Sequence, residues 1–146
     1  MRYIAPALLL LIVVGCSTTQ SIPIEDRSRT YDVSYDVAFD AVVLALAEQG
    51  YAVEEANKEQ GVINTDFLLQ ESFLSWLSSS ASRMKVTSLV RDTEAGVRVM
   101  LTIALQDSDP EATGPNYSSR NLRASQARRV YDSLFAHIEA VMWSDN

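Results

Sequence analysis

The chain has 146 residues, and its 19 acidic and 12 basic side chains give a formal net charge of −7 at pH 7. This balance argues against nucleic-acid binding, because contact with phosphates uses clustered Lys and Arg side chains. With one cysteine and one histidine, the chain cannot form an internal disulfide and is short of ligands for a zinc site. We therefore expect neither a metal nor another cofactor.

The N-terminal segment has the layout of a signal peptide. Arg2 precedes an apolar run of eleven residues, Ile4 to Val14, and the run leads into Gly15 and Cys16. A transmembrane anchor is the alternative interpretation, but a bilayer span needs about 20 residues and this run also contains Pro6. Residues 1–15 are therefore predicted to be a cleaved signal peptide.

The residues Val-Val-Gly-Cys at the end of this segment resemble the lipobox of bacterial lipoproteins. The resemblance implies that Cys16 is lipidated, with two or more acyl chains for stable attachment, and becomes the first residue of the mature chain. Ser17 follows, whereas Asp there resembles an inner-membrane retention signal, so we expect the periplasmic face of the outer membrane. Residues 16–28 are small and polar and predict a lipidated flexible tether, ahead of a single domain over 29–146.

The first predicted elements of the domain are a strand and a helix. Alternation at Tyr31, Val33 and Tyr35 predicts a strand over 29–35. Asp36 is the expected N-cap of the following helix, and Gly50 is expected to end it. The buried face of this helix is expected to hold Phe39, Val43, Leu46 and Ala47.

Two hairpins and a second helix complete the prediction. The strands are expected over 51–56, 62–67, 85–91 and 97–105, and residues 107–118 form a predicted loop because they contain two prolines and a glycine. The apolar residues expected to face inward from the last strand are Val97, Val99, Leu101, Ile103 and Leu105. A closing helix over about 119–143 is expected to bury Ala127, Val130, Tyr131, Leu134, Phe135, Ile138, Val141 and Met142. The predicted class is α+β, an antiparallel sheet with two helices packed on one face in the order β-α-β-β-β-β-α.

The segment from 68 to 83 is the candidate binding segment. Leu69, Phe73, Trp76 and Leu77 recur at helical spacing, and a serine-rich run follows them. One interpretation is a short helix that completes the core. The other is an exposed apolar patch that binds a partner, because such contacts use aromatic and leucine anchors. The patch lacks basic residues for anionic lipid, so it favours a protein partner over the membrane.

The sequence offers few candidate catalytic residues. His137 lies among apolar helix positions and is expected at the edge of the buried stripe. The acids of the first hairpin, Glu54, Glu55, Glu59 and Asp66, are expected to form a solvated surface, with Glu54 and Glu55 on opposite faces of a strand. Four arginines near the start of the closing helix are expected to pair with the acidic first half of the domain or to be solvated, and the alternative is a contact with an anion or a protein: Arg120, Arg123, Arg128 and Arg129.

The stretch YDVAFDAVVLALAEQGYAVEEANKEQGVINTDF, residues 35–67, is similar to the small α+β domain of BamC-like envelope lipoproteins. That family is named for the accessory lipoprotein of the outer-membrane β-barrel assembly machine, which has two such domains and a long N-terminal segment. This chain has room for one domain and a short tether, so partner contacts of the long segment do not carry over. The resemblance implies a helix-grip fold and an envelope lipoprotein that is not an enzyme.

These observations predict an interaction or accessory subunit, anchored through Cys16 to the outer membrane and in contact with an envelope protein. Outer-membrane protein assembly is the process that the resemblance suggests. The alternative is a periplasmic binding protein that holds an apolar or peptide ligand between the sheet and the C-terminal helix. A hydrolase is the least favoured class, because no recognisable nucleophile motif accompanies His137.

Overall fold

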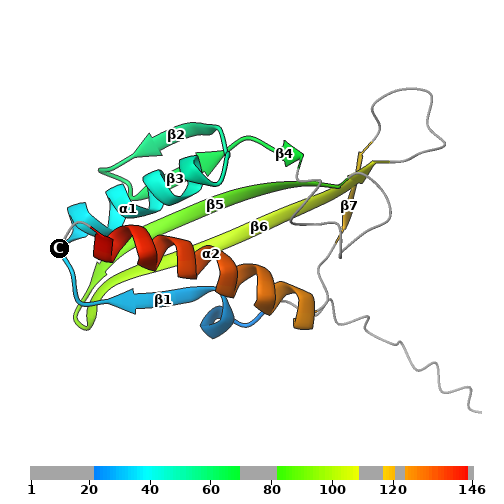
Figure 1. Ribbon diagram of the computed structural model, residues 1–146. Coiled ribbons are helices and arrows are strands. Elements are labelled where there is room, and N and C mark those ends of the chain that lie inside the picture. Colours follow the sequence, from blue (N-terminus) through cyan, green and yellow to red (C-terminus); the bar gives the residue numbers. More distant parts are fainter. Residues whose placement is uncertain (1–21, 70–81, 109–116, 121–123, 145–146) are drawn as a thin grey trace, which may run out of the picture.

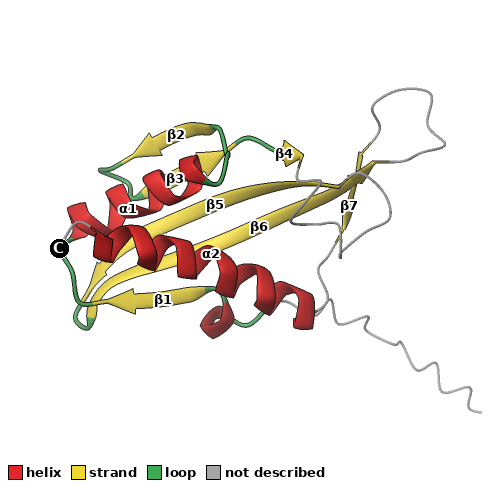
Figure 2. Cartoon of the chain, in the orientation of Figure 1, coloured by secondary structure: helices red, strands yellow, loops and turns green. Residues whose placement is uncertain are grey.

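The computed structural model describes residues 22–69, 82–108, 117–120 and 124–144 (Figure 1). The elements in chain order are the 3-10 turn η1 (Ile24–Asp26), β1 (Ser28–Tyr31), α1 (Tyr35–Glu48), β2 (Val53–Asn57), β3 (Val62–Thr65), β4 (Leu68–Leu69), β5 (Ser82–Thr93), β6 (Gly96–Ser108), β7 (Tyr117–Arg120) and α2 (Ala124–Ser144). The strands form one antiparallel sheet in the order β1-β6-β5-β3-β2, with β4 beside β5 and β7 beside β6. Both helices lie on one side of this sheet (Figure 2). The predicted α+β class and its element order are confirmed, with β4 and β7 as additional short strands.

The long hairpin of β5 and β6 is the centre of the sheet. It pairs continuously from Ser82 opposite Asp107 to Thr93 opposite Gly96, so both strands are longer than predicted. Alternate residues face the helices and are buried, as the period of two requires. In β6 the buried residues are Val97, Val99, Leu101 and Leu105, as predicted, whereas Ile103 is only half-buried.

Helix α1 begins two residues earlier than an N-cap at Asp36 would allow. Its N-cap is Ser34, whose hydroxyl accepts a hydrogen bond from the Val37 amide at 3.4 Å, so the prediction of Asp36 as the cap is wrong. Gly50 ends the helix as predicted. Its φ of 88° is accessible to glycine, and a Schellman arrangement forms from Gly50 N to Ala47 O at 2.9 Å and Tyr51 N to Leu46 O at 3.0 Å.

The early start of α1 shortens the predicted strand before it. Strand β1 ends at Tyr31, and Tyr35 is the first helical residue. The Tyr35 ring stacks on Phe39 at 6.0 Å, and its hydroxyl donates to the Lys58 carbonyl at 2.7 Å. From its helical position, Tyr35 thus packs its ring and forms a hydrogen bond through its hydroxyl. The alternating pattern had placed this residue in a strand.

The buried face of α1 is rotated relative to the prediction. Phe39 and Leu46 are buried, but Val43 is half-buried and Ala47 is exposed. Four small or medium residues take the remaining buried positions: Ala38, Ala41, Val42 and Ala45. Small residues here let α1 lie close to the sheet and to α2, and the low hydrophobicity of the three alanines explains why the pattern pointed elsewhere.

Helix α2 begins at Ala124 rather than near residue 119. The predicted first residues of the helix, 119 and 120, instead belong to β7, where Ser119 pairs with Gln106 and Arg120 with Leu105. The predicted loop over 107–118 is likewise shorter, because β6 continues to Ser108 and β7 starts at Tyr117. The buried stripe of α2 is confirmed at all predicted positions except Val141, which is half-buried.

A polar cluster joins α2 to the edge strand β1. Arg29 donates to Glu139 at 2.7 Å and to Asp132 at 2.9 Å, and its guanidinium lies over the Phe135 ring at 4.8 Å. Tyr31 donates to the same Glu139 carboxylate at 3.0 Å. Burial is the largest single influence on the pKa of Arg29 and lowers it, but the hydrogen bond to Glu139 and the nearby charges of Glu139, Tyr31 and Asp132 together raise that pKa. The cluster holds the long helix across the sheet edge.

Candidate interaction surfaces

A hollow of about 280 Å³ lies between the first turns of α1 and the last turn of α2. The two helices run side by side on the sheet, so that α2 ends next to the beginning of α1 (Figure 1). From α1, the hollow is lined by Val37 and Leu44, with Ala41 between them. From α2, it is lined by Val141 and Met142. Val37 is 42% exposed and Leu44 is 47% exposed, so the hollow presents apolar side chains to solvent. We call this site the α1–α2 groove.

Carboxylates form one rim of the α1–α2 groove. Asp36 and Asp40 are one helical turn apart, and Lys58 from the β2–β3 turn lies between them, 3.0 Å from Asp36 and 3.1 Å from Asp40. Hydrogen bonds to these two carboxylates raise the pKa of the Lys58 ammonium. Two carboxylates and one ammonium leave the rim with a net negative charge, and both aspartates are largely exposed.

The sheet face opposite the helices is a second uncovered surface. We call it the outer face, formed by the residues of the strands that alternate with the buried ones. At its centre Val62, Leu89 and Met100 lie opposite one another across β3, β5 and β6, and all three are half-buried. Its basic residues are Arg83, Lys85, Arg91 and Arg98.

Most of the residues predicted to bind lipid or a partner lie outside the described residues, namely Cys16, Phe73, Trp76 and Leu77. Of the predicted patch, only Leu69 is described, and only by its backbone. As part of β4 it pairs with Arg83 of β5, so the interpretation that places Leu69 in a short helix is wrong at this residue. The reason is the free edge of β5, whose backbone groups pair with an extended segment that follows β3 directly.

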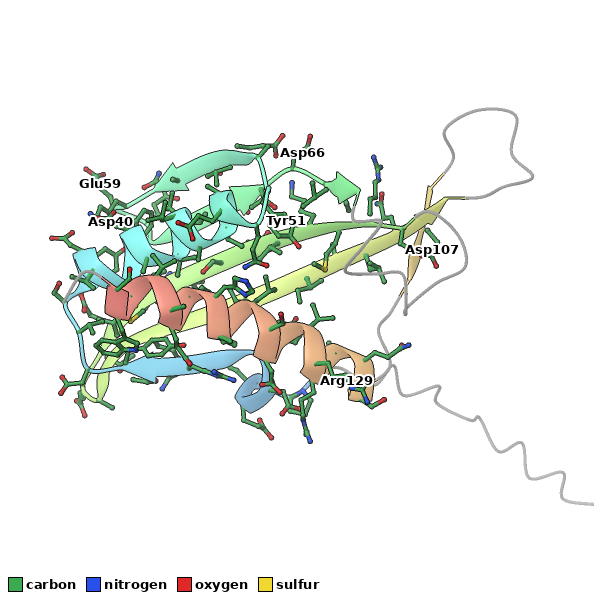
Figure 3. All side chains as sticks on the ribbon, viewed as in Figure 1. Asp40, Tyr51, Glu59, Asp66, Asp107 and Arg129 are labelled. Atoms are coloured by element: carbon green, nitrogen blue, oxygen red, sulfur yellow. The ribbon has the colours of Figure 1, made fainter. Side chains whose placement is uncertain are left out.

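The acidic residues of the first hairpin do not converge on one site. Glu59 and Asp66 lie at opposite ends of the β2–β3 hairpin (Figure 3). Lys85 lies 3.4 Å from Glu54, and Glu55 accepts from the Asn64 amide at 2.9 Å. Among the described residues, no group of three or more His, Cys, Asp or Glu side chains could hold a metal ion.

The prediction that Glu54 and Glu55 point to opposite faces is wrong. The pairing of β2 with β3 shifts between Val53 and Glu55, which leaves Glu54 as the additional residue of a β-bulge. The two residues of a bulge oppose a single residue on the partner strand, so their side chains share one side. Glu54 accordingly reaches Lys85, and Glu55 reaches Asn64, both on the outer face.

The other candidate residues have structural surroundings. His137 is exposed, and its Nδ1 lies 3.0 Å from the Ser133 carbonyl oxygen, which agrees with its predicted place at the edge of the stripe. Arg128 makes two hydrogen bonds of 3.1 Å to Asp26 and so pairs with the acidic first half, as one alternative predicted. Arg129 lies near the start of α2 (Figure 3). Arg120 is described only by its backbone in β7, and Arg123 lies outside the described residues.

We did not predict the α1–α2 groove from the sequence. Val37 and Leu44 are seven residues apart and so share one helical face, but this signal was hidden by the neighbouring apolar residues of α1. Which apolar face of α1 is covered depends on where α2 crosses it, and this is a tertiary property.

No known protein family model matches the sequence, and no curated protein matches it either. No helix in the described part of the chain is both long enough and apolar enough to cross a bilayer.

Proposed function

We propose that this chain is a lipid-anchored envelope protein without enzymatic activity, which acts as an interaction or accessory subunit at the periplasmic face of the outer membrane. The observation that carries the proposal is the α1–α2 groove, where two exposed apolar side chains, Val37 and Leu44, lie beside the carboxylates of Asp36 and Asp40. The lipobox-like residues that end in Cys16 support the anchor. The likeness to BamC-like lipoproteins supports the same class of function.

The chemistry of the α1–α2 groove selects the kind of partner. Apolar side chains in a shallow hollow accept an aliphatic or aromatic anchor residue, which loses its contact with water on binding. The net negative rim favours a lysine or arginine next to that anchor, because opposite charges at an interface rim steer association. The partner is therefore an envelope protein that presents an apolar residue next to a basic one.

A photoreactive residue at Glu48, one turn beyond Leu44 and exposed, tests this proposal in cells. We expect a cross-link to one envelope protein, at a peptide that contains an apolar residue beside Lys or Arg. Leu44→Gln should lower the cross-linked yield about ten-fold, because an interface anchor contributes about 1–3 kcal/mol. The matched control Ala136→Gln, at an exposed position of α2, should leave the yield unchanged.

Leu44→Gln should also leave the fold intact, because glutamine is a good helix former and Leu44 is 47% exposed. Thermal melting checks this directly. An equal yield in the parent and in both variants would contradict the α1–α2 groove as the binding site.

The anchor is tested separately. Mass spectrometry of the mature chain should show Cys16 as the first residue with acyl chains attached. Cys16→Ser should move the protein from the membrane fraction to the periplasmic fraction. A full-length N-terminus without acyl groups would contradict the lipoprotein assignment, and would leave the groove experiment interpretable.

A further inference from the structure

On the outer face of the sheet, the two central strands β5 and β6 carry basic residues although the chain as a whole is acidic. β5 and β6 place four bases on this face, namely Arg83, Lys85, Arg91 and Arg98, and no acidic residue alternates with them. The acids on this face belong to the edge strand β2, where Glu54 and Glu55 are the two residues of the bulge. Of these, Glu54 is paired with Lys85.

Arg91 and Arg98 form a pair of like charges on the outer face. They are directly opposite each other in the β5–β6 register, and both are exposed. Like charges directly opposite on neighbouring strands destabilise a sheet. Among the described residues, neither arginine has a hydrogen bond or an ion pair with a carboxylate, in contrast to Arg29 and Arg128. An external anion between the two guanidinium groups would relieve this repulsion.

The surroundings of the arginine pair suit a lipid surface. The next residues inward on the same face are Leu89 and Met100, with Val62 beside Leu89, and all three are half-buried. The face therefore combines exposed cations with partly accessible apolar side chains, which is the composition of surfaces that lie in a membrane interface. Arginine also binds phosphate through two donors in one plane.

The helix layer has the opposite charge. The acids of α1 and α2 are Asp36, Asp40, Glu48, Asp132 and Glu139, whereas their described bases are Arg128 and Arg129. An anionic surface thus attracts the outer face and repels the helices. Between Cys16 and Ile22, the first described residue, six residue steps span at most about 22 Å. A tether this short lets the domain come within the roughly 8 Å over which the surface charge of a membrane acts before salt screens it.

We propose that the outer face of the sheet docks on the anionic phosphate headgroups of the membrane in which the chain is anchored, with Arg91 and Arg98 as the central contacts. This proposal rests on the proposed lipid anchor, which supplies the proximity. Each basic residue near an anionic surface increases the bound population about five-fold. Docking in this orientation turns the α1–α2 groove away from the membrane, toward a partner.

The test uses the full lipidated chain in vesicles of phosphatidylcholine, with or without 30% phosphatidylglycerol. Cys16 is the only cysteine, and it is acylated in the mature chain, so a single new thiol can carry a fluorophore. One label is placed at Thr102→Cys on the outer face, and the matched label at Ala136→Cys on α2, both at exposed positions. A headgroup spin-labelled lipid quenches fluorescence near the membrane.

In vesicles that contain phosphatidylglycerol, we expect quenching at residue 102 to be at least two-fold greater than quenching at residue 136. The double variant Arg91→Gln/Arg98→Gln, or 0.5 M NaCl, should return it to the level of pure phosphatidylcholine. The control Arg128→Gln/Arg129→Gln removes the same charge from the helix layer and should retain the effect. Thermal melting confirms that each variant is folded.

Equal quenching at residues 102 and 136, or quenching at 102 that does not depend on phosphatidylglycerol, would overturn the proposal. If a photoreactive residue at 102 then captures a protein in cells and the double variant abolishes that capture, an acidic protein is the occupant instead. Flotation with pure phosphatidylcholine vesicles reports the anchor alone. The anchor and the docking surface can therefore fail independently.

Discussion

Tyr31 and Tyr51 are both buried aromatic residues, but their hydroxyl groups differ in hydrogen bonding. The Tyr31 hydroxyl donates to Glu139 at 3.0 Å, whereas the Tyr51 hydroxyl has no hydrogen-bond partner among the described residues. A hydrogen bond to a charged group contributes more to stability than a neutral one, and a buried hydroxyl without a partner costs free energy. The two residues thus form a natural pair for comparison.

We expect Tyr31→Phe to lower the free energy of unfolding by about 1.5–3 kcal/mol, because it removes the hydrogen bond to Glu139 and leaves that carboxylate less satisfied. Tyr51→Phe should be neutral or should stabilise the fold by about 1 kcal/mol, because it removes an unpaired buried hydroxyl. Urea denaturation of the two variants measures both values. Equal losses in both would contradict this account of the two hydroxyl groups.

The same tyrosines predict a loss of stability at alkaline pH. Burial raises the pKa of Tyr31, with a further increase from Glu139, and burial alone raises the pKa of Tyr51. Their contribution to stability is complete below the unfolded-state pKa, about 10, and is lost as the pH rises above it. The urea midpoint should therefore be lower at pH 11 than at pH 9. The decrease should be smaller in Tyr51→Phe, because that variant has one buried tyrosine fewer to ionise.

At the scale of elements, Thr65 fills a gap in the sheet. Strand β3 pairs with β5 as far as Asn64 opposite Thr87, and β4 resumes the pairing at Leu68 opposite Met84. Between them the Thr65 hydroxyl donates to the Val86 carbonyl at 3.2 Å and accepts from the Val86 amide at 3.1 Å. One side chain therefore replaces a rung of the backbone ladder where the chain leaves β3.

Thr65→Val should destabilise the fold by about 2 kcal/mol, since it keeps the shape but leaves the buried amide and carbonyl of Val86 without a partner. Thr65→Ser retains the hydroxyl and should cost only about 1 kcal/mol, the value of one methyl group. Hydrogen exchange of the Val86 amide provides a local measurement, with faster exchange expected only in the valine variant. An unchanged exchange rate in Thr65→Val would contradict the role of the hydroxyl.

At the scale of the whole molecule, the two uncovered surfaces lie on opposite sides of the sheet. The α1–α2 groove belongs to the acidic helix layer, and the arginine pair belongs to the outer face. If the outer face docks on the membrane and the groove binds a partner, the two contacts can exist together. The sheet then separates a membrane side from a partner side.

This arrangement predicts independent effects of mutations at the two surfaces. Leu44→Gln should reduce cross-linking to the partner and leave the quenching by anionic lipid unchanged. Arg91→Gln/Arg98→Gln should abolish the dependence on phosphatidylglycerol, and should reduce partner cross-linking less than three-fold, because the anchor still holds the domain at the membrane. Both readouts should be measured on the same preparations. Loss of both in either variant would point to a single shared site.

The order of elements and most of the core could be predicted because they depend on local periodicity. The stripe of α2 and the alternation in β6 follow from side-chain directions that the backbone sets within a few residues. The end of α1 at Gly50 is equally local, since glycine readily takes a positive φ. The N-cap was misassigned within two residues, because Ser34 and Asp36 are both good caps.

The amino-acid sequence by itself determined the α+β class, the closing helix and the acidic balance of this protein, and its lipobox-like segment remains the source of the predicted anchor. Only the tertiary structure decided that Leu69 extends the sheet, that Glu54 and Glu55 share one face, and that Arg91 lies opposite Arg98. Register, bulges and helix crossing bring together residues far apart in the chain. Their energies depend on the pairing partner, which no local pattern contains.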